Sequence, residues 1–223
     1  YSIMADKKIM FDFLQDLSNN NSTECMDENR ARYQMAKDIW LEEIDLILTR
    51  LAKHDPYFIQ FQPKQTISRI NNNRRFNKSK PLYKDYFNCM PMNREDRYAK
   101  IAIAAGVSWS FLGGGLHMPE KEQLEKMRQA VDYDGEVLKE IVNEPKFKAF
   151  FGGLSEDKNA LKTAPRGYAK DHPHVDLLRR KSFTATVYLS PEFVQSEHFV
   201  DHVEEAYLLL QPFNEYIERA STC

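Results

Sequence analysis

The sequence of 223 residues has few cysteines and no long hydrophobic run. Its three cysteines, Cys25, Cys89 and Cys223, are far apart and form no CxxC pair. This spacing argues against a disulfide scaffold and a structural zinc site, and it favours reduced thiols in the cytoplasm. No segment approaches the roughly 20 consecutive apolar residues of a membrane-spanning helix. We therefore expect no membrane association.

The sequence also lacks a leader signal and an excess of charge of either sign. Residues 1–6 include no basic segment followed by an apolar stretch, so we expect no secretory signal peptide and a cytoplasmic location. Lys and Arg number 31 against 33 Asp and Glu, which gives a formal net charge of −2. Because there is no global basic field, nucleic acid is not an expected partner.

One segment of the chain has no acidic residue, and another has no basic residue. Residues 56–84 contain seven Lys and Arg but no Asp or Glu, and residues 191–218 contain seven Asp and Glu but no Lys or Arg. Either the two segments neutralise each other, or the basic segment forms an open anion site. Aromatic residues such as Phe76 and Tyr83 beside the cations favour the site, and Arg binds phosphate or carboxylate through two parallel hydrogen bonds.

Hydrophobic periodicity predicts helices at both ends of the chain and strands between them. In the first half we expect helices over Lys7–Leu17 and Asp27–Lys53, strands over 65–70, 83–89, 98–104 and 107–112, and a tight turn at Ala105-Gly106. We expect Gly113-Gly114-Gly115 to end the last of these strands.

The second half is predicted to be mainly helical. We expect helices from Pro119, over Gly135–Val142, from Pro145 to the stop at Gly152-Gly153, over His174–Arg180 and after Ser190-Pro191, with a loop over 155–171, a strand over Phe183–Leu189 and a kink or break at Pro212. The predicted fold is α+β: a single domain over 1–223, with a mostly antiparallel central sheet flanked by N-terminal and C-terminal helices.

Short motifs spread over nearly the whole chain carry a family resemblance. They are Leu17-Ser18-Asn19-Asn20-Asn21, Arg69-Ile70, Arg75-Phe76-Asn77-Lys78, Phe111-Leu112-Gly113-Gly114-Gly115, Phe151-Gly152-Gly153-Leu154, Pro165-Arg166-Gly167-Tyr168 and Asp171-His172-Pro173. The chain resembles the DUF2461 family, a conserved hypothetical family of bacteria and some fungi. The resemblance implies one DUF2461-like domain and no particular reaction.

The chain departs from the family pattern at several positions. Asn72 and Asn73 stand where the family usually has an Arg-Asp pair, Cys25-Met26 where it has Trp-Phe, and Ser79 where it has Asp. If the missing Arg and Asp bind or catalyse in the family, this member has altered or lost that activity.

Two motifs have both a functional and a structural interpretation. The three glycines at 113–115 bring backbone N–H groups close together, as a phosphate site requires, but they lack the GxxxxGK[ST] pattern, and a bulge in a sheet explains them as well. His172 lies in the long loop and is a candidate general acid or base. The alternative is that Asp171 caps a helix that Pro173 begins.

Metal and nucleophilic chemistry have little support in the sequence. His198, Asp201 and His202 form H-x-x-D-H, which places two imidazoles on one helix face, but no third ligand is evident and surface histidines explain the pattern. No serine lies in a G-x-S-x-G motif. We expect no metal and no cofactor.

The leading hypothesis is a basic pocket for a small ligand that carries phosphate or carboxylate. The candidate ligand-binding residues are Arg69, Arg75, Lys78, Lys80, Tyr83, Lys84, Gly114 and Arg166. Whether the protein is an enzyme stays open, and His172 is the catalytic candidate if it is one. The alternative is a non-enzymatic module that contacts an acidic protein or a nucleic-acid backbone through residues 64–84. The oligomeric state is not predicted.

Overall fold

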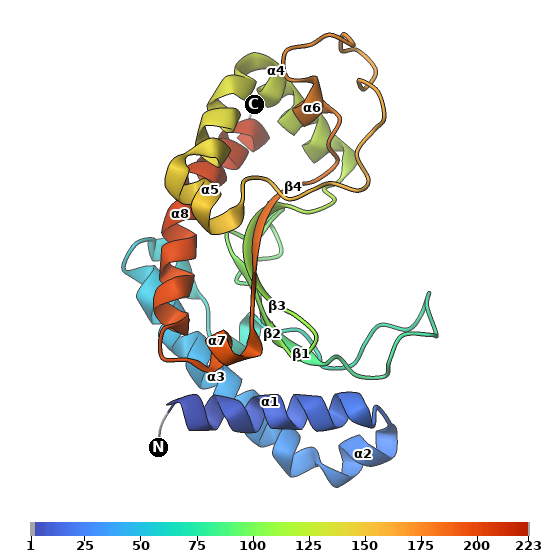
Figure 1. Cartoon of the computed structure of the whole chain (residues 1–223), viewed down its shortest axis with the longest axis vertical. Helices are drawn as coiled ribbons and strands as arrows, with labels where there is room; N and C mark the ends of the chain where they lie inside the picture. The colour runs from blue at the N-terminus through green and yellow to red at the C-terminus, as the bar shows by residue number, and fades with distance from the viewer. Residues whose placement is uncertain (1–2, 223) are drawn as a thin grey trace. The chain divides into compact units, whose positions relative to one another are not determined.

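The computed structural model describes residues 3–222 and has the predicted α+β fold (Figure 1). The helices are α1 (Ile3–Asn19), α2 (Thr23–Glu28), α3 (Arg30–Ala52), α4 (Lys121–Asn143), α5 (Pro145–Phe151), α6 (Val175–Leu178), α7 (Pro191–Gln195) and α8 (Phe199–Thr222), with 3-10 turns η1 (Pro56–Gln60) and η2 (Pro63–Gln65). The strands are β1 (Tyr86–Cys89), β2 (Ala102–Gly106), β3 (Ser110–Leu116) and β4 (Phe183–Leu189). They form one antiparallel sheet in the order β1-β2-β3-β4.

The chain divides into two compact units, and neither is a continuous stretch of sequence. Unit 1 contains the described residues up to Pro91, Ala102–Leu112 and Tyr188–Glu205, whereas unit 2 contains Met92–Ile101, Gly113–Val187 and the described residues from Ala206 onward. No helix in the described part of the chain has both the length and the apolar character that crossing a bilayer requires.

In unit 1, α1 packs on α3 through apolar side chains at helical spacing. The fully buried members include Met10 and Leu14 of α1 and Trp40, Ile44 and Leu51 of α3. The predicted helix over Asp27–Lys53 is interrupted at Asn29, whose φ of −112° and ψ of 21° separate α2 from α3. Its side-chain amide donates to the Cys25 carbonyl at 2.8 Å, which offers the chain a local alternative to the helical hydrogen bond.

The hairpin strands differ from the prediction at their ends. In the β1–β2 ladder, Tyr86 pairs with Gly106 and Cys89 with Ile103, so Gly106 belongs to a strand and the turn covers residues 107–109. The predicted strand over 65–70 is absent; those residues form η2 and an irregular segment. The Asn71–Tyr83 bridge joins this segment to residues 83–90, together with backbone bonds from Lys84 N–H to the Ile70 carbonyl and from Met90 N–H to the Thr66 carbonyl, each at 2.8 Å.

The glycines at 113–115 lie inside β3 and do not end it. A Cβ at Gly113 would lie 2.8 Å from the Ala185 carbonyl oxygen, and Gly115 has a φ of +107° with the Phe183 carbonyl oxygen where its Cβ would be. The glycines therefore let β4 approach β3 closely, as a strand bulge does.

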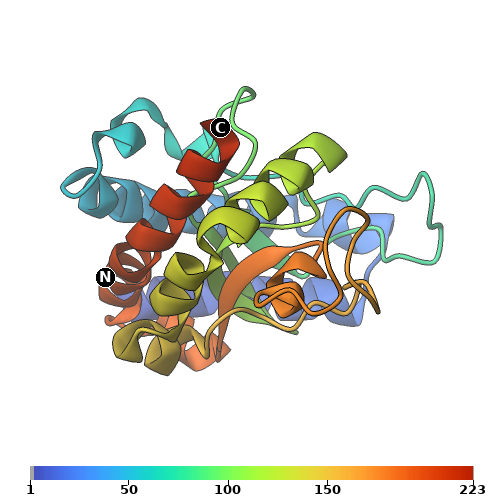
Figure 2. The same cartoon turned by 90° about the horizontal axis from the view of Figure 1, so that it is seen from above.

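In unit 2, α4 packs beside the C-terminal part of α8, as both views show (Figures 1 and 2). Lys126 donates to the Ser221 carbonyl at 3.2 Å, and the Tyr216 hydroxyl donates to Asp134 at 2.9 Å. Asp134 has non-helical φ and ψ of −143° and 40°, which explains the predicted break before Gly135 as a kink within one helix. Of the predicted kink or break at Pro212, the break is absent, since α8 continues through this residue.

A buried ion pair anchors three segments of unit 1. The Lys7 ammonium donates to Glu43 at 2.9 Å and to the Val194 carbonyl at 2.6 Å, and the two charged side chains are 1% and 4% exposed. Burial lowers the pKa of Lys7, while Glu43 opposes that shift. The pair links α1 and α3 to α7, which is far from both in the sequence.

We predict that Lys7→Met destabilises the fold by about 3–5 kcal/mol, because it leaves the Glu43 carboxylate buried without a partner. The double variant Lys7→Met/Glu43→Leu recovers most of this loss, since no charge then remains buried. Urea unfolding at pH 7 measures both variants.

The matched control is Lys8→Met on the same helix. Lys8 pairs with Asp12 at 2.8 Å, but both side chains are more than half exposed. This substitution changes the free energy of unfolding by less than about 1 kcal/mol. An equally small effect of Lys7→Met contradicts the anchoring role.

Candidate functional site

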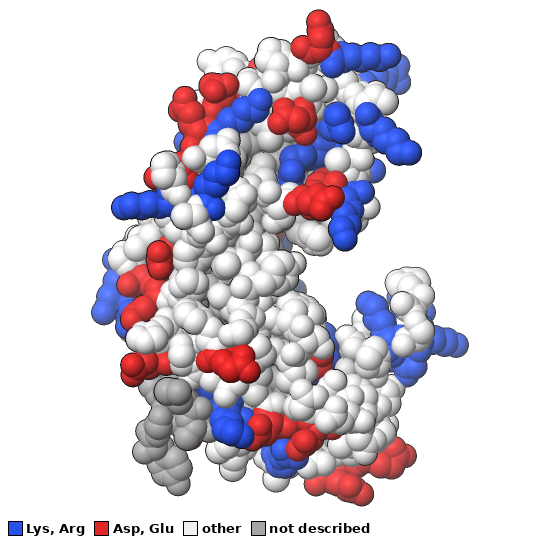
Figure 3. All heavy atoms as spheres, in the orientation of Figure 1, with Lys and Arg blue, Asp and Glu red and all other residues white. Residues whose placement is uncertain are grey.

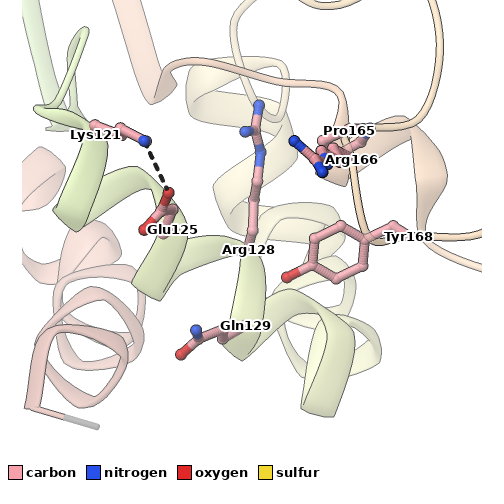
Figure 4. Close-up of a pocket in the computed structure, with 7 residues that line it drawn as sticks. All are labelled: Lys121, Glu125, Arg128, Gln129, Pro165, Arg166 and Tyr168. Carbon is pink, nitrogen blue, oxygen red and sulfur yellow. Dashed lines mark ion pairs between the residues drawn. The ribbon is translucent and has the colours of Figure 1, made fainter.

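A pocket of about 380 Å³ lies in unit 2 between α4 and the loop that precedes α6. It is lined by Lys121, Glu125, Arg128, Gln129, Pro165, Arg166 and Tyr168 (Figure 4). Three of these side chains are cationic and one is anionic. Glu125 lies 3.9 Å from Lys121, so the lining charge that remains is that of the two arginines.

Helix α4 presents its polar face to the pocket. Residues 121, 125, 128 and 129 recur at three- and four-residue steps, which places them on one side of the helix. Met127 and Val131 lie on the adjacent side of the helix and are buried. The amphipathic pattern of α4 therefore orients Arg128 toward the pocket.

The Arg128 guanidinium is fixed by backbone carbonyls. Its Nε donates to the Leu178 carbonyl at 2.9 Å and its Nη2 to the Arg180 carbonyl at 3.2 Å. Burial lowers the pKa of Arg128, with Tyr168 and Glu125 opposing the shift. The remaining guanidinium N–H groups stay available as donors.

Arg166 reaches the pocket from a tight turn over 165–168. Tyr168 N–H donates to the Pro165 carbonyl at 3.1 Å, and Gly167 has a φ of +93°. This positive φ at the third position is typical of a type II turn, which favours glycine there. Arg166 is exposed at the corner of the turn, and its guanidinium points toward Arg128 (Figure 4).

Tyr168 completes the lining with a hydroxyl that is protonated at neutral pH. Burial raises its pKa, and the negative charge of Asp132 acts in the same direction. Figure 4 shows the hydroxyl directed toward the Arg128 side chain. A protonated phenol can donate a hydrogen bond to an anion there.

His172 holds the loop against α4. Its Nδ1 accepts from the His174 N–H at 3.0 Å, so its Nε2 carries the proton and donates to Asp132 at 2.6 Å. Its ring lies edge-on to Tyr168, with centroids 6.2 Å apart. Because both ring nitrogens have protein partners, the arrangement favours a positioning role over proton transfer.

Asp157 anchors the other end of the loop. One carboxylate oxygen accepts from the N–H groups of Lys181 at 2.6 Å and Ser182 at 2.9 Å, and the other accepts from Asn159 at 2.9 Å. Burial acts to raise its pKa, but these three bonds and the charge of Arg180 outweigh it, so the pKa is lowered. The loop is therefore fixed by backbone donors on a single carboxylate.

The predicted ligand-binding residues fall into two groups. Arg166 lines the pocket in unit 2. Gly114, also in unit 2, lies within β3, where a Cβ would meet Leu210 Cδ1 at 3.0 Å. The remaining six, which all belong to unit 1, are Arg69, Arg75, Lys78, Lys80, Tyr83 and Lys84.

Arg75, Lys78 and Lys80 lie on a loop over residues 71–83, and Figure 3 shows Lys and Arg side chains gathered on this projecting segment. Arg69, Arg75, Lys78 and Lys80 are exposed, while Tyr83 is 6% exposed. Lys84 donates to Ser68 Oγ at 2.9 Å and also to the Arg69 carbonyl. Tyr83 is a structural residue, whose N–H and carbonyl both bond to the Asn21 side chain.

Three further lining residues, Lys121, Arg128 and Gln129, were not predicted from the sequence. Their three- and four-residue spacing was visible on the polar face of the predicted helix from Pro119. Nothing in the sequence indicated that this face lies beside the 165–168 turn, because tertiary bonds join the two segments: those of Arg128 to the Leu178 and Arg180 carbonyls and that of His172 to Asp132.

Metal and thiol chemistry gain no support from the described residues. None of their His, Cys, Asp and Glu side chains form a group of three suited to a metal ion. Asp201 of the H-x-x-D-H pattern pairs with Arg50 at 2.7 Å. Burial raises the pKa of the Cys89 thiol to about 12, so this thiol stays protonated.

The family model described as "Conserved hypothetical protein (DUF2461)" matches residues 9–216. The chain belongs to the DUF2461 family. This confirms the family resemblance of the sequence, and both the pocket and the projecting loop lie inside the matched region. Searches of curated proteins and of solved structures found no match to this DUF2461 member.

We predict that Asp157→Asn destabilises the protein at pH 7 and that the difference from wild type narrows on acidification. The pKa of Asp157 is lower in the folded protein than its ordinary value of 3.8, so the ionised carboxylate stabilises the folded state at any pH above 3.8. This stabilisation is lost as the pH falls through the pKa of Asp157 in the folded protein. The cost at pH 7 is about 1–3 kcal/mol. Urea unfolding between pH 7 and pH 3 measures it.

The control for this titration is Glu156→Gln, the exposed neighbour of Asp157. Its effect on stability stays within about 0.5 kcal/mol. A penalty for Asp157→Asn that does not change with pH shows that the charge of the carboxylate contributes nothing.

Proposed function

We propose that the protein binds a small anionic ligand in the unit 2 pocket, through Arg128 and Arg166. The observation that carries the proposal is that the Arg128 and Arg166 guanidinium groups converge on the pocket (Figure 4). The carboxylate in the lining, Glu125, lies beside Lys121 and does not pair with either arginine. Two like charges directed toward one another repel unless an anion lies between them. Guanidinium forks match the oxygens of phosphate and carboxylate.

The size and polarity of the pocket limit the ligand class. A volume of about 380 Å³ is at the lower end of the range for small-molecule sites. Tyr168 and Gln129 add neutral hydrogen-bonding groups beside the arginines. The pocket therefore suits one phosphate or carboxylate group on a small polar body.

The geometry supports binding and not a defined reaction. His172 has protein partners on both ring nitrogens, and the Tyr168 hydroxyl is protonated at neutral pH. The proposed role of His172 and Asp132 is to hold Tyr168 and the 165–168 turn against α4. The arginines supply the interaction with the anion.

We predict that a matching anion raises the melting temperature of the wild type at fixed ionic strength. The probes are inorganic phosphate, pyrophosphate, citrate and a nucleoside monophosphate. A ligand at 100 times its Kd stabilises the protein by about 2.7 kcal/mol, which corresponds to roughly 5–10 °C for a chain of this size. Titration calorimetry then gives the Kd of the best probe.

The decisive variant is Arg166→Gln, which removes the exposed guanidinium and keeps an amide of similar length. Loss of a charge-assisted bond of about 1.5–3 kcal/mol weakens binding about 10-fold to 150-fold. Lys146→Ala, at an exposed lysine elsewhere in unit 2, leaves the Kd unchanged. Equal shifts with every anion, or an unchanged Kd in Arg166→Gln, count against the pocket.

A further inference from the structure

A basic loop projects from unit 1 and carries exposed cations around one exposed aromatic ring. We define the basic loop as residues 71–83, closed at its base by the Asn71–Tyr83 bridge and by the bond from Asn72 N–H to the Leu82 carbonyl at 2.9 Å. Phe76 is 88% exposed, and the Arg75 guanidinium lies 5.3 Å from its ring centroid. Figures 1 and 2 both show the loop extending away from the other elements of unit 1.

The basic loop has internal order despite its exposure. Asn73 Oδ1 accepts from Arg75 N–H at 3.0 Å, and Asn77 Oδ1 accepts from Ser79 N–H at 3.0 Å. Arg74 donates to the Lys78 carbonyl. These local turns hold Arg75, Lys78 and Lys80 outward, so that less conformational entropy is lost when they bind a partner.

A row of aromatic rings begins where the basic loop ends. We call Tyr86, Trp109 and Phe111 the aromatic platform. The ring centroids of Tyr86 and Trp109 are 4.8 Å apart, and those of Trp109 and Phe111 are 5.3 Å apart. Trp109 is 39% exposed, and the other two rings are partly exposed. The Lys84 ammonium lies 5.9 Å from the Tyr86 centroid and joins the platform to the loop.

The turn that carries Trp109 is fixed from two sides. Ser108 Oγ donates to Asp85, and Val107 N–H donates to the Asp85 carbonyl at 3.2 Å. Gly106 lies opposite Tyr86, where a Cβ would be 2.6 Å from the Tyr86 Cβ. The absent side chain lets the Tyr86 and Trp109 rings pack together.

We propose that the basic loop and the aromatic platform bind single-stranded nucleic acid. Cations beside partly exposed flat rings are the two elements of sequence-tolerant single-strand recognition: the cations follow the phosphates and the rings stack on bases. An acidic peptide has no flat faces to cover the platform. A lipid surface suits an apolar tip, but Phe76 lies between Arg75 and Asn77.

The first measurement is fluorescence anisotropy with labelled oligonucleotides of about 16 nucleotides, the upper end of the usual single-domain site. Single-stranded DNA and RNA of one sequence and the corresponding DNA duplex are compared in 100 mM salt. We expect both single strands to bind more tightly than the duplex, and the ratio of their Kd values shows which strand is preferred. No binding, or tighter binding of the duplex, overturns the proposal.

The two elements are separated by the dependence of the Kd on salt. The triple variant Arg75→Gln/Lys78→Gln/Lys80→Gln lowers the slope of log K against log salt by about 2, since each lost phosphate contact contributes about 0.7. Trp109→Ala leaves the slope unchanged and weakens binding about fivefold or more. Lys53→Ala, at an exposed lysine elsewhere in unit 1, changes neither quantity. Wild-type affinity in both test variants overturns the proposal.

The wild-type protein provides a measurement that does not depend on a variant folding. The protein has two tryptophans, and Trp40 is fully buried whereas Trp109 is not. Iodide therefore quenches mainly the fluorescence of Trp109. A base stacked on Trp109 shields it from iodide and reduces this quenching. Unchanged iodide quenching in the bound state overturns the stacking. Binding of poly-glutamate or anionic vesicles in place of oligonucleotides assigns the surface to an acidic protein or to a membrane.

Discussion

The structure of unit 1 depends on one buried ammonium group. Lys7 donates to the Glu43 carboxylate, to the Val194 carbonyl and to the Ser196 carbonyl, and its ammonium also lies 5.2 Å from the Phe199 ring centroid. A buried charge is tolerated only when it is paired and hydrogen-bonded. Two helices from the beginning of the chain and a segment near its end must therefore meet at this point for the charge to be satisfied.

Unit 2 satisfies its partly buried cations differently, mostly through backbone carbonyls. Arg128, Arg179 and Arg180 donate to the carbonyls of Leu178, Leu161 and Ser182 at 2.9 Å each. Carbonyl acceptors satisfy N–H groups without cancelling positive charge. The bonds that fix Arg128 therefore leave the positive charge of its guanidinium in place at the pocket. A structural arginine held in this way keeps the charge that the proposed anion site requires.

Much of the fold was predictable because local signals and tertiary packing agree. The strand over Phe183–Leu189 and the helix from Pro145 to the stop at Gly152 have the predicted bounds, since alternation and the left-handed φ of +80° at Gly152 are local properties. The glycines at 113–115 were predicted to end a strand, but they lie inside β3 and allow the close approach of β4. That contact has no signature within the segment itself.

In the candidate sites, too, local features were predictable from the sequence and tertiary contacts were not. The exposed cations of residues 56–84 were evident from the absence of acids, but a count of charges does not distinguish a projecting loop from a concave cluster. Arg166 was predicted from its motif, and it lines the pocket. Arg128 was not, since its position depends on bonds to Leu178 and Arg180, about 50 residues away.

A net charge of −2 does not decide whether either basic surface binds anions, because charge acts locally in salt. The Debye length is about 8 Å at physiological ionic strength. Within the acidic C-terminal segment, Asp201 and Glu204 pair with Arg50 of α3, and Glu204 also lies 3.2 Å from His54. Among the described residues, no carboxylate forms an ion pair with Arg75, Lys78 or Lys80. Asp201 and Glu204 are thus paired with α3 and its end, and the exposed cations Arg75, Lys78 and Lys80 keep their positive charge at the surface.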